Sequence, residues 1–353
     1  MNYTELLSLL VLVASLLPIS ALIMTGSGKV ALVTGATRGI GKGIALELAE
    51  EGYKVYCTGR SMGGVSTQGL TLEGTIKEIQ EAGGQAVGIA CDHAVDSQVK
   101  AVVERVEKEE GRLDLLVNNA FQLTTPDGAA GLLNQKFYEQ GAAGWDEVHT
   151  VGLRSHYMAS CYAVPLMIKT ASTSGSTPLI AHISSFGGLT YTFNVAYVSA
   201  LCAVDRLAND MAIELEEDNV ACVSVWPGVV MTERNKALVD SGEWERDVGL
   251  PVDQAESPRF TGRAVAALAS DISILSKSGS VQVVAECAKE YGFVDMNGSA
   301  PPSIRSLKFM IPAYVLPKIF VNDPERVSKI SSYVPDLLLP MGFLRNSKPP
   351  PQE

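Results

Sequence analysis

The chain has 353 residues, of which 46% are hydrophobic, so it is long and apolar enough to bury a sizeable core. This composition excludes disorder of the whole chain. The formal net charge of −11 would repel phosphate backbones and anionic lipid headgroups, and it therefore disfavours nucleic acid as a partner.

Six cysteines are scattered along the chain, without a C-x-x-C pair and without a histidine at metal-ligand spacing. Most of them lie in apolar runs. The pattern predicts buried free thiols in a reducing compartment, and it supports neither a disulfide framework nor a zinc site. The six are Cys57, Cys91, Cys161, Cys202, Cys222 and Cys287.

The N-terminus carries an apolar stretch, residues 6–24, with no charge over 19 residues, which is close to the ~20 residues that cross a bilayer. We assign residues 1–27 as a hydrophobic membrane anchor. A cleaved signal peptide and a helix lying on the domain are the alternatives, although no basic region precedes the stretch and no clean cleavage site follows it. Positive charges appear only after it, at Lys29, Arg38 and Lys42, which places the domain in the cytosol.

From Lys29 onward, short β-branched runs alternate with amphipathic helical patterns, as in βαβ units that feed a parallel sheet. Strands are predicted at residues 30–34, 54–58, 86–90, 113–117, 179–183, 221–226 and 281–284. Helices are predicted at residues 40–51, 72–81, 96–110, 145–168, 196–217 and 262–269. The alternation predicts a single doubly wound Rossmann-type α/β domain at residues 28–300, with seven parallel strands and helices on both faces.

The alternation stops near Asn297, and residues 301–353 form a proline-rich tail with apolar patches such as residues 309–316. No patch is long enough to span a membrane. The tail has three alternatives: it packs on the domain, covers a substrate mouth, or lies on a bilayer. Residues 346–353 have a composition typical of disorder.

The first predicted strand runs directly into a glycine-rich turn and then a helix, which is the arrangement that binds the pyrophosphate of a dinucleotide at a helix N-terminus. Glycines permit the tight turn and the close approach of backbone to phosphate. The residues predicted to bind cofactor here are Gly35, Thr37, Arg38, Gly39, Ile40 and Gly41.

The second strand ends in Cys57-Thr58-Gly59-Arg60, where a site for NAD would usually place an acid that binds the ribose 2′-hydroxyl. No acid is present there. Arg60 and Arg38 could instead hold the 2′-phosphate of NADP through charge-assisted bonds, so the sequence favours NADP(H) over NAD(H).

Six motifs in this order resemble the short-chain dehydrogenase/reductase family. Besides the glycine turn they are Asp92, Asn118-Asn119-Ala120, Ser184-Ser185, Tyr197, and Pro227-Gly228 with Thr232. The resemblance implies cofactor contacts at Asp92, Asn118, Ala120, Tyr197, Pro227, Gly228 and Thr232. Residues 151–154, 193–197 and 222–228 resemble a member associated with the endoplasmic reticulum, which implies NADPH-dependent reduction of steroid or xenobiotic carbonyls.

Carbonyl reduction needs a proton donor at the carbonyl oxygen and a second group that orients it. By resemblance Tyr197 is the donor and Ser185 is the orienting group, although Ser184 is its direct neighbour and only one of the two can face the site. In the family, a lysine one helical turn after the tyrosine lowers the tyrosine pKa. This chain has Leu201 there, and no cation lies on the same helix face.

The family also has an asparagine, in the helix before the fifth strand, that organises a water-mediated proton relay. Gly152 stands at that position here, so the relay is in doubt. His149 and His156 flank Gly152, and without a third ligand they are interpreted as structural histidines.

Three functional hypotheses follow. The first is an NADPH-dependent carbonyl reductase, or alcohol dehydrogenase in the reverse direction, acting on a lipophilic small molecule and held at the endoplasmic reticulum membrane. The second is a nucleotide-binding protein without turnover, because Leu201 replaces the lysine. The third is a fold that only mediates association. The glycine-rich insert at residues 121–144 and the loop-like segment at residues 231–250 are predicted to line the substrate mouth. The resemblance favours a homo-oligomer.

Overall fold

The computed structural model describes residues 26, 28–63, 70–122, 136–244, 250, 252–320 and 323–344. The predicted anchor at residues 6–24 and the predicted disordered end at residues 346–353 lie outside these ranges, as do parts of both predicted inserts. Within the described ranges, no helix is both long enough and apolar enough to cross a bilayer.

Seven parallel strands form one sheet in the order β3-β2-β1-β4-β5-β6-β7. The prediction of a doubly wound parallel sheet is confirmed, and no strand boundary differs from the predicted one by more than two residues. The strands are β1 (Val30–Val33), β2 (Lys54–Gly59), β3 (Gln85–Ala90), β4 (Leu115–Asn118), β5 (Leu179–Ile183), β6 (Ala221–Trp226) and β7 (Val281–Val283).

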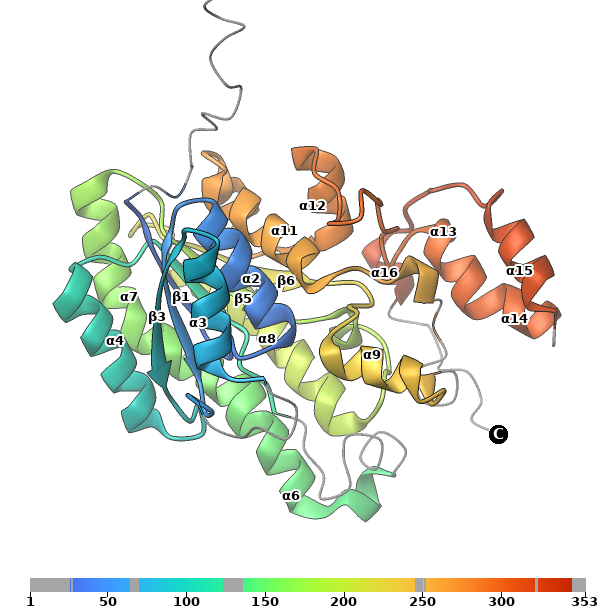
Figure 1. Ribbon diagram of the computed structural model, residues 1–353, viewed down its shortest axis with the longest axis horizontal. Helices are drawn as coiled ribbons and strands as arrows, with labels where there is room; N and C mark the ends of the chain where they lie inside the picture. The colour runs from blue at the N-terminus through green and yellow to red at the C-terminus, as the bar shows by residue number, and fades with distance from the viewer. Residues whose placement is uncertain are drawn as a thin grey trace, which may run out of the picture.

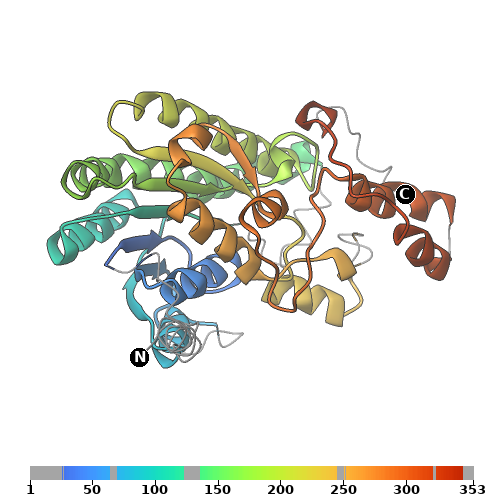
Figure 2. The ribbon, with the colours of Figure 1, turned by 90° about the horizontal axis from the view of Figure 1, so that it is seen from above.

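Helices cover both faces of the sheet, because alternate residues of each strand point to opposite sides. Ala31 and Val33 face α2 (Gly39–Glu50), α3 (Leu72–Glu81), α11 (Pro258–Ser270) and α12 (Val284–Tyr291). Leu32 and Leu116 face α4 (Asp96–Glu110), α7 (Ser155–Ser174) and α8 (Val195–Glu214). Figures 1 and 2 show the strands between these two layers.

The predicted helix at residues 145–168 is helical throughout, but it contains a turn of π-helix that the prediction did not include. Helix α6 (Phe137–His149) passes through a π-helical turn, η1 (Thr150–Arg154), into α7. The π turn contains Gly152, which lies against Phe121 in the site described below. Short 3-10 turns also occur at η2 (Phe186–Gly188), η3 (Val252–Gln254) and η4 (Ile274–Lys277).

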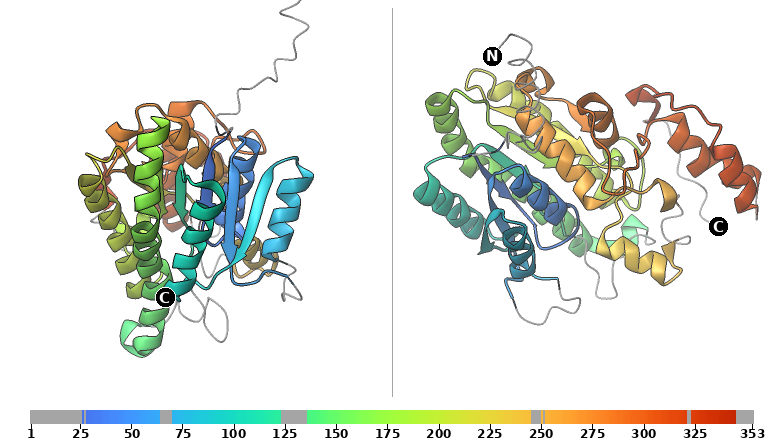
Figure 3. Two further views of the ribbon diagram at one scale, coloured as in Figure 1. Left: turned by 90° about the vertical axis from the view of Figure 1, so that its left-hand side faces the viewer. Right: turned by 45° about the horizontal axis from the view of Figure 1, so that its top comes forward.

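The tail folds into short helices at one end of the molecule, visible beyond α9 (Glu233–Asp240) and α12 in Figures 1 and 3. Of the three alternatives, packing on the domain is what the structure describes. Phe309, 2% exposed, packs in a core cluster with Trp226 and Trp244, while Arg305 holds the Glu286 carboxylate through Nε at 2.6 Å and Nη2 at 2.5 Å. The tail elements are α13 (Leu307–Met310), η5 (Ile311–Val315), α14 (Leu316–Ile319), α15 (Pro324–Ser331) and α16 (Met341–Leu344).

All six cysteines are free thiols. The prediction of burial holds for four of them and is wrong for Cys161 on α7 and Cys202 on α8, which are exposed. Their apolar sequence neighbours belong to helices rather than strands, so one helical face reaches solvent while the other packs on the sheet.

Candidate active site

The glycine turn after β1 is packed so closely that side chains are excluded from it. A Cβ on Gly35, whose φ is +68°, would lie 2.9 Å from Ala120 Cα, and a Cβ on Gly41 would lie 2.4 Å from the Gly35 carbonyl oxygen. Thr34 ties the turn to the end of β4, because its hydroxyl oxygen accepts from the amides of Asn119 and Ala120 at 2.9 Å each. The turn and the segment after β4 therefore form one rigid floor.

The N-terminus of α2, with the amide of Gly39, forms a site where an anion can bind, here called the anion seat. Arg38, its N-cap residue, makes no side-chain cap, and Gly39, with φ +59°, donates its amide to Glu233 Oε2 at 2.9 Å. A carboxylate thus takes the kind of place that a dinucleotide phosphate takes at a helix N-terminus, where amides and the helix dipole favour negative charge. Ile40 packs behind this turn, against the core.

The end of β2 meets the glycine turn. A Cβ on Gly59 would lie 2.1 Å from the Thr37 hydroxyl, so Gly59 is required for this approach. The contact brings Arg60, the next residue, to the rim that also carries Arg38, and both arginines are exposed. Together they can receive an anionic group beside the anion seat.

Asp92 follows β3 at the same sheet edge. Its carboxylate accepts from the Ala94 amide at 3.0 Å, which closes a short turn. Next to it, His93 is buried, and its Nε2 lies 2.7 Å from the Thr58 hydroxyl. Burial lowers the pKa of His93 to about 4, so the ring is neutral near pH 7. The sequence analysis did not single out His93, although its place directly after a strand was a usable signal.

The side chain of Asn118 is not brought to the glycine turn. It is buried under α7, where its amide nitrogen donates to Ser160 Oγ at 3.0 Å and to the His156 carbonyl at 3.3 Å. Its neighbour Asn119 holds the turn instead, because its side-chain amide donates hydrogen bonds to the carbonyl oxygens of Thr34 at 2.9 Å and Gly35 at 3.1 Å. Asn119 is therefore a site residue that the sequence analysis named only as part of a motif.

The two serines after β5 point to different places. Ser184 is buried and faces the carbonyl of Leu201, 3.4 Å away, and the side chain of Asp205. Ser185 accepts from the Gly187 amide at 3.1 Å and lies close enough to Tyr197 for its hydroxyl to lower the tyrosine pKa by hydrogen bonding. Only Ser185 shares a site with Tyr197.

Tyr197 lies in the first turn of α8, where its amide donates to the N-cap side chain of Asn194 at 2.8 Å. Two rings pack edge-on against it, Phe121 at 5.6 Å and Phe193 at 5.3 Å between centroids. Phe193 has a φ of +60°, a strained value for a residue with a Cβ. Burial raises the pKa of Tyr197, while Ser185 and the Arg234 guanidinium act against that rise.

Leu201 is 5% exposed and packs under the turn after Ser185, where a Cβ on Gly187 would lie 3.1 Å from its Cδ1. The position of the expected lysine is thus apolar and filled. The expected asparagine is replaced in the same way: a Cβ on Gly152 would lie 2.5 Å from Cε2 of Phe121. Gly152 and the π turn make room for the ring that packs on Tyr197.

The segment after β6 closes the site. Pro227 is buried, and a Cβ on Gly228 would lie 2.9 Å from Glu256 Oε2. Burial raises the pKa of the Glu256 carboxyl to about 8, so it is largely protonated at neutral pH. The Thr232 hydroxyl caps α9 by accepting from the Asn235 amide at 3.3 Å, and its methyl carbon lies 3.4 Å from the Cβ position on Gly39.

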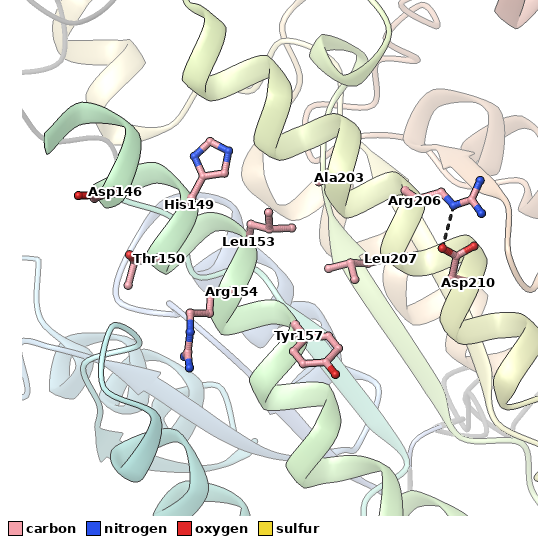
Figure 4. Close-up of a pocket in the computed structure, with 10 residues that line it drawn as sticks. All are labelled: Asp146, His149, Thr150, Leu153, Arg154, Tyr157, Ala203, Arg206, Leu207 and Asp210. Atoms are coloured by element: carbon pink, nitrogen blue, oxygen red, sulfur yellow. Dashed lines mark hydrogen bonds and ion pairs between the residues drawn. The ribbon is translucent and has the colours of Figure 1, made fainter. Parts of the chain in front are cut away.

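A groove between α7 and α8 lies apart from this site (Figure 4). Leu153, Tyr157 and Leu207 line it, and the Arg206–Asp210 ion pair stands at one end. His149 stacks on Trp145 nearby with 3.6 Å between ring centroids, and its Nε2 lies 3.3 Å from the Ser199 hydroxyl. His156 is buried, with Nε2 3.2 Å from the Ala120 carbonyl oxygen.

Comparison with known proteins agrees with this geometry. Residues 29–242 match the short chain dehydrogenase family. The chain belongs to that family. Its short-chain dehydrogenase fold is similar to the Pseudomonas aeruginosa RhlG/NADP active-site complex, with a TM-score of 0.62 at 22% identity over 74% of this chain and 96% of that one.

Two curated relatives with higher sequence identity have names of oxidoreductases. The chain is 40% identical over 293 residues to dehydrogenase/reductase SDR family member 1 of Mus musculus, covering 80% of this chain and 88% of the relative. It is 31% identical over 254 residues to 7alpha-hydroxysteroid dehydrogenase of Clostridium sardiniense, covering 70% and 88%. This short-chain dehydrogenase is therefore an oxidoreductase by family, and the family uses nicotinamide dinucleotides.

Proposed function

We propose that this chain reduces carbonyl groups of lipophilic small molecules with NADPH. The observation that carries the proposal is the pairing of Ser185 with Tyr197 beside an intact glycine turn. A phenol and a hydroxyl that share one site can donate two hydrogen bonds to one carbonyl oxygen, which is what carbonyl reduction requires of the protein.

The anion seat fits a dinucleotide. The Gly39 amide donates a hydrogen bond to the Glu233 carboxylate, which shows that an anionic group fits there. The packing at Gly35 and Gly41 leaves room for backbone alone. Arg38 and Arg60 on the shared rim, with no acid after β2, favour the 2′-phosphate of NADP(H) over the 2′-hydroxyl of NAD(H).

When bound, the cofactor supplies a hydride to the carbonyl carbon. Tyr197 donates its phenol proton to the carbonyl oxygen, so that hydride and proton together give the alcohol. Ser185 donates a hydrogen bond to the same oxygen and fixes its position. Tyr197 then regains a proton from solvent, and the reverse sequence would oxidise an alcohol.

The surroundings of Tyr197 favour an apolar substrate. Phe121 and Phe193 flank the phenol, and Leu201 replaces a charged residue below it. The segment after β6 packs in the apolar cluster that contains Trp226 and Phe309. The relative named 7alpha-hydroxysteroid dehydrogenase supports a steroid-like substrate class.

A nucleotide-binding protein without turnover is the second candidate, and Leu201 is the observation that favours it. Without a cation on α8 the phenol is a weaker acid. Fluorescence titration with NADPH and NADH, followed by NADPH oxidation with quinones, aldehydes and steroid ketones, separates the two candidates. Turnover by the native protein supports the reductase; binding with turnover only in Leu201→Lys supports the second candidate, and failure to bind excludes both.

Arg38→Ala and Arg60→Ala test the cofactor preference in the same titration, with Lys77→Ala, an exposed charge on α3, as the control. We expect both arginine variants to weaken NADPH binding by about tenfold or more while NADH binding changes little, since each charge-assisted bond contributes about 1.5–3 kcal/mol. Equal losses for both dinucleotides would contradict the preference.

We further propose that residues 6–24 hold the protein at the endoplasmic reticulum membrane with the domain in the cytosol, and that two copies associate. The uncharged sequence of that stretch supports the first part. The groove between α7 and α8, with Trp145 and Tyr157 exposed beside it, supports the second. Carbonate extraction of cell membranes and light scattering of the purified protein test these two proposals.

A further inference from the structure

Helix α9 begins at the anion seat. Its first residue, Glu233, accepts a hydrogen bond from the Gly39 amide through Oε2 at 2.9 Å, and the residue before it, Thr232, lies against the same glycine. The two partners of the bond are 194 positions apart in the sequence, so the contact joins the segment after β6 to the glycine turn. A carboxylate of the chain therefore holds an amide of the kind that binds phosphate groups at a helix N-terminus.

The Gly39 amide can donate one well-aligned hydrogen bond. Gly39 is the first residue of α2, so its amide has no acceptor within the helix, and the bond to Glu233 satisfies it. A phosphate oxygen at the same amide would lie beside the carboxylate, and two negative charges that close repel each other more strongly at a protein site than in bulk water. The Glu233 carboxylate and a dinucleotide phosphate are thus alternative occupants of the anion seat.

Helix α9 can give up this contact without unfolding. None of its residues is buried, so turning the Glu233 side chain away from Gly39 opens no cavity in the core. The start of the helix is held by local bonds of Asn235, whose backbone amide donates to the Thr232 hydroxyl at 3.3 Å and whose side chain donates to the Val230 carbonyl at 2.7 Å. These bonds do not involve the carboxylate, so they can persist when it leaves the anion seat.

We propose that Glu233 is an internal competitor of the cofactor, which lowers the affinity of the site for dinucleotides by holding the Gly39 amide until a phosphate displaces it. The carboxylate is tethered beside the amide, so its effective concentration there is high and constant. The exchange makes and breaks no covalent bond, because the amide hydrogen stays on nitrogen and only changes its acceptor. The pyrophosphate is common to NADPH and NADH, so the competition weakens the binding of both by the same factor, whereas Arg38 and Arg60 are expected to act on the 2′-phosphate alone.

The inference rests on the proposed function, and it is tested by binding rather than by turnover. Fluorescence titration with NADPH and with NADH, at one ionic strength, compares the native protein with Glu233→Ala, Glu233→Gln and Asp240→Asn. Asp240 is an exposed acid at the other end of α9, so its variant removes an equal charge away from the anion seat. Glutamine keeps an oxygen that can accept from Gly39 but removes the charge, so Glu233→Gln separates a structural contact from competition between anions.

We expect Glu233→Ala to bind NADPH and NADH more tightly than the native protein by the same factor of about tenfold or more, the size of one charge-assisted hydrogen bond. Glu233→Gln should bind both more tightly by a smaller factor, and Asp240→Asn should bind them as the native protein does. Native or weaker affinity in both Glu233 variants, or an equal gain in Asp240→Asn, overturns the inference even if the native protein reduces carbonyls. Tighter binding in Glu233→Ala without turnover in any of the four proteins overturns the proposed function and leaves the competition standing, while no dinucleotide binding in any of them overturns both.

Discussion

Truncation of Phe309 tests whether the tail is part of the folded domain. Its ring is 2% exposed and packs in one cluster with Trp226, Trp244 and Ile304, and edge-on to Tyr314 with 6.3 Å between centroids. Phe309→Ala removes a fully buried aromatic side chain, which typically costs about 3–5 kcal/mol when the surrounding atoms cannot fill the cavity.

Urea unfolding followed by circular dichroism measures the loss, with Phe343→Ala as the matched control. Phe343 belongs to the same tail but is 55% exposed, so its truncation should change the free energy of unfolding by no more than about 0.5 kcal/mol. We expect a lower urea midpoint for Phe309→Ala alone. Equal midpoints for the two variants would refute the reasoning and leave the tail as an independent appendage.

Three further predictions follow from the site. Gly152→Ala should destabilise the protein through the collision with Phe121, and Phe121→Ala should relieve that cost in a double-mutant cycle of unfolding free energies; additive costs would contradict the packing argument. Acidification should destabilise the protein as pH falls from about 6.5 to about 4, because burial lowers the pKa of His93, His156 and His182, which are protonated more readily in the unfolded chain. An unfolding free energy that does not change over this pH range would refute this prediction. Glu256→Gln should stabilise the protein relative to the native chain more at pH 8 than at pH 5. The pKa of the native carboxyl is raised to about 8, so its contribution to folding stability is complete below about pH 4.5 and is lost as pH rises to 8. An equal difference in unfolding free energy between the two proteins at both pH values would argue against a buried neutral carboxyl.

The fold was largely predictable, because parallel strands buried on both faces read as β-branched runs and their helices show a regular period. The π turn at η1 was not predicted, and Gly152 within it lies against Phe121, a residue 31 positions earlier in the sequence. The packing of the tail could not be predicted either. Phe309 packs in one cluster with Trp226, and nothing in the local sequence of the proline-rich segment indicates that partner.

The candidate site was predictable as a set of motifs but not as a set of orientations. The order of the motifs pointed to Tyr197, whereas the distinction between Ser184 and Ser185 needed the side-chain directions. Asn118 was predicted at the cofactor and lies under α7, because a strand's last residue can face either layer. The contact between Glu233 and Gly39 carried no sequence signal, since it arises from the docking of α9 on the glycine turn.

The most direct test of the account is NADPH oxidation by the full chain and by Tyr197→Phe, each given the same lipophilic ketones and quinones. The phenylalanine variant keeps the ring and loses only the phenol. We predict measurable turnover by the native protein and a loss of about 10²- to 10⁴-fold in the variant, with NADPH binding retained. Equal turnover in the two proteins would contradict the role of Tyr197, and NADPH binding without turnover in either would identify a nucleotide-binding protein rather than a reductase.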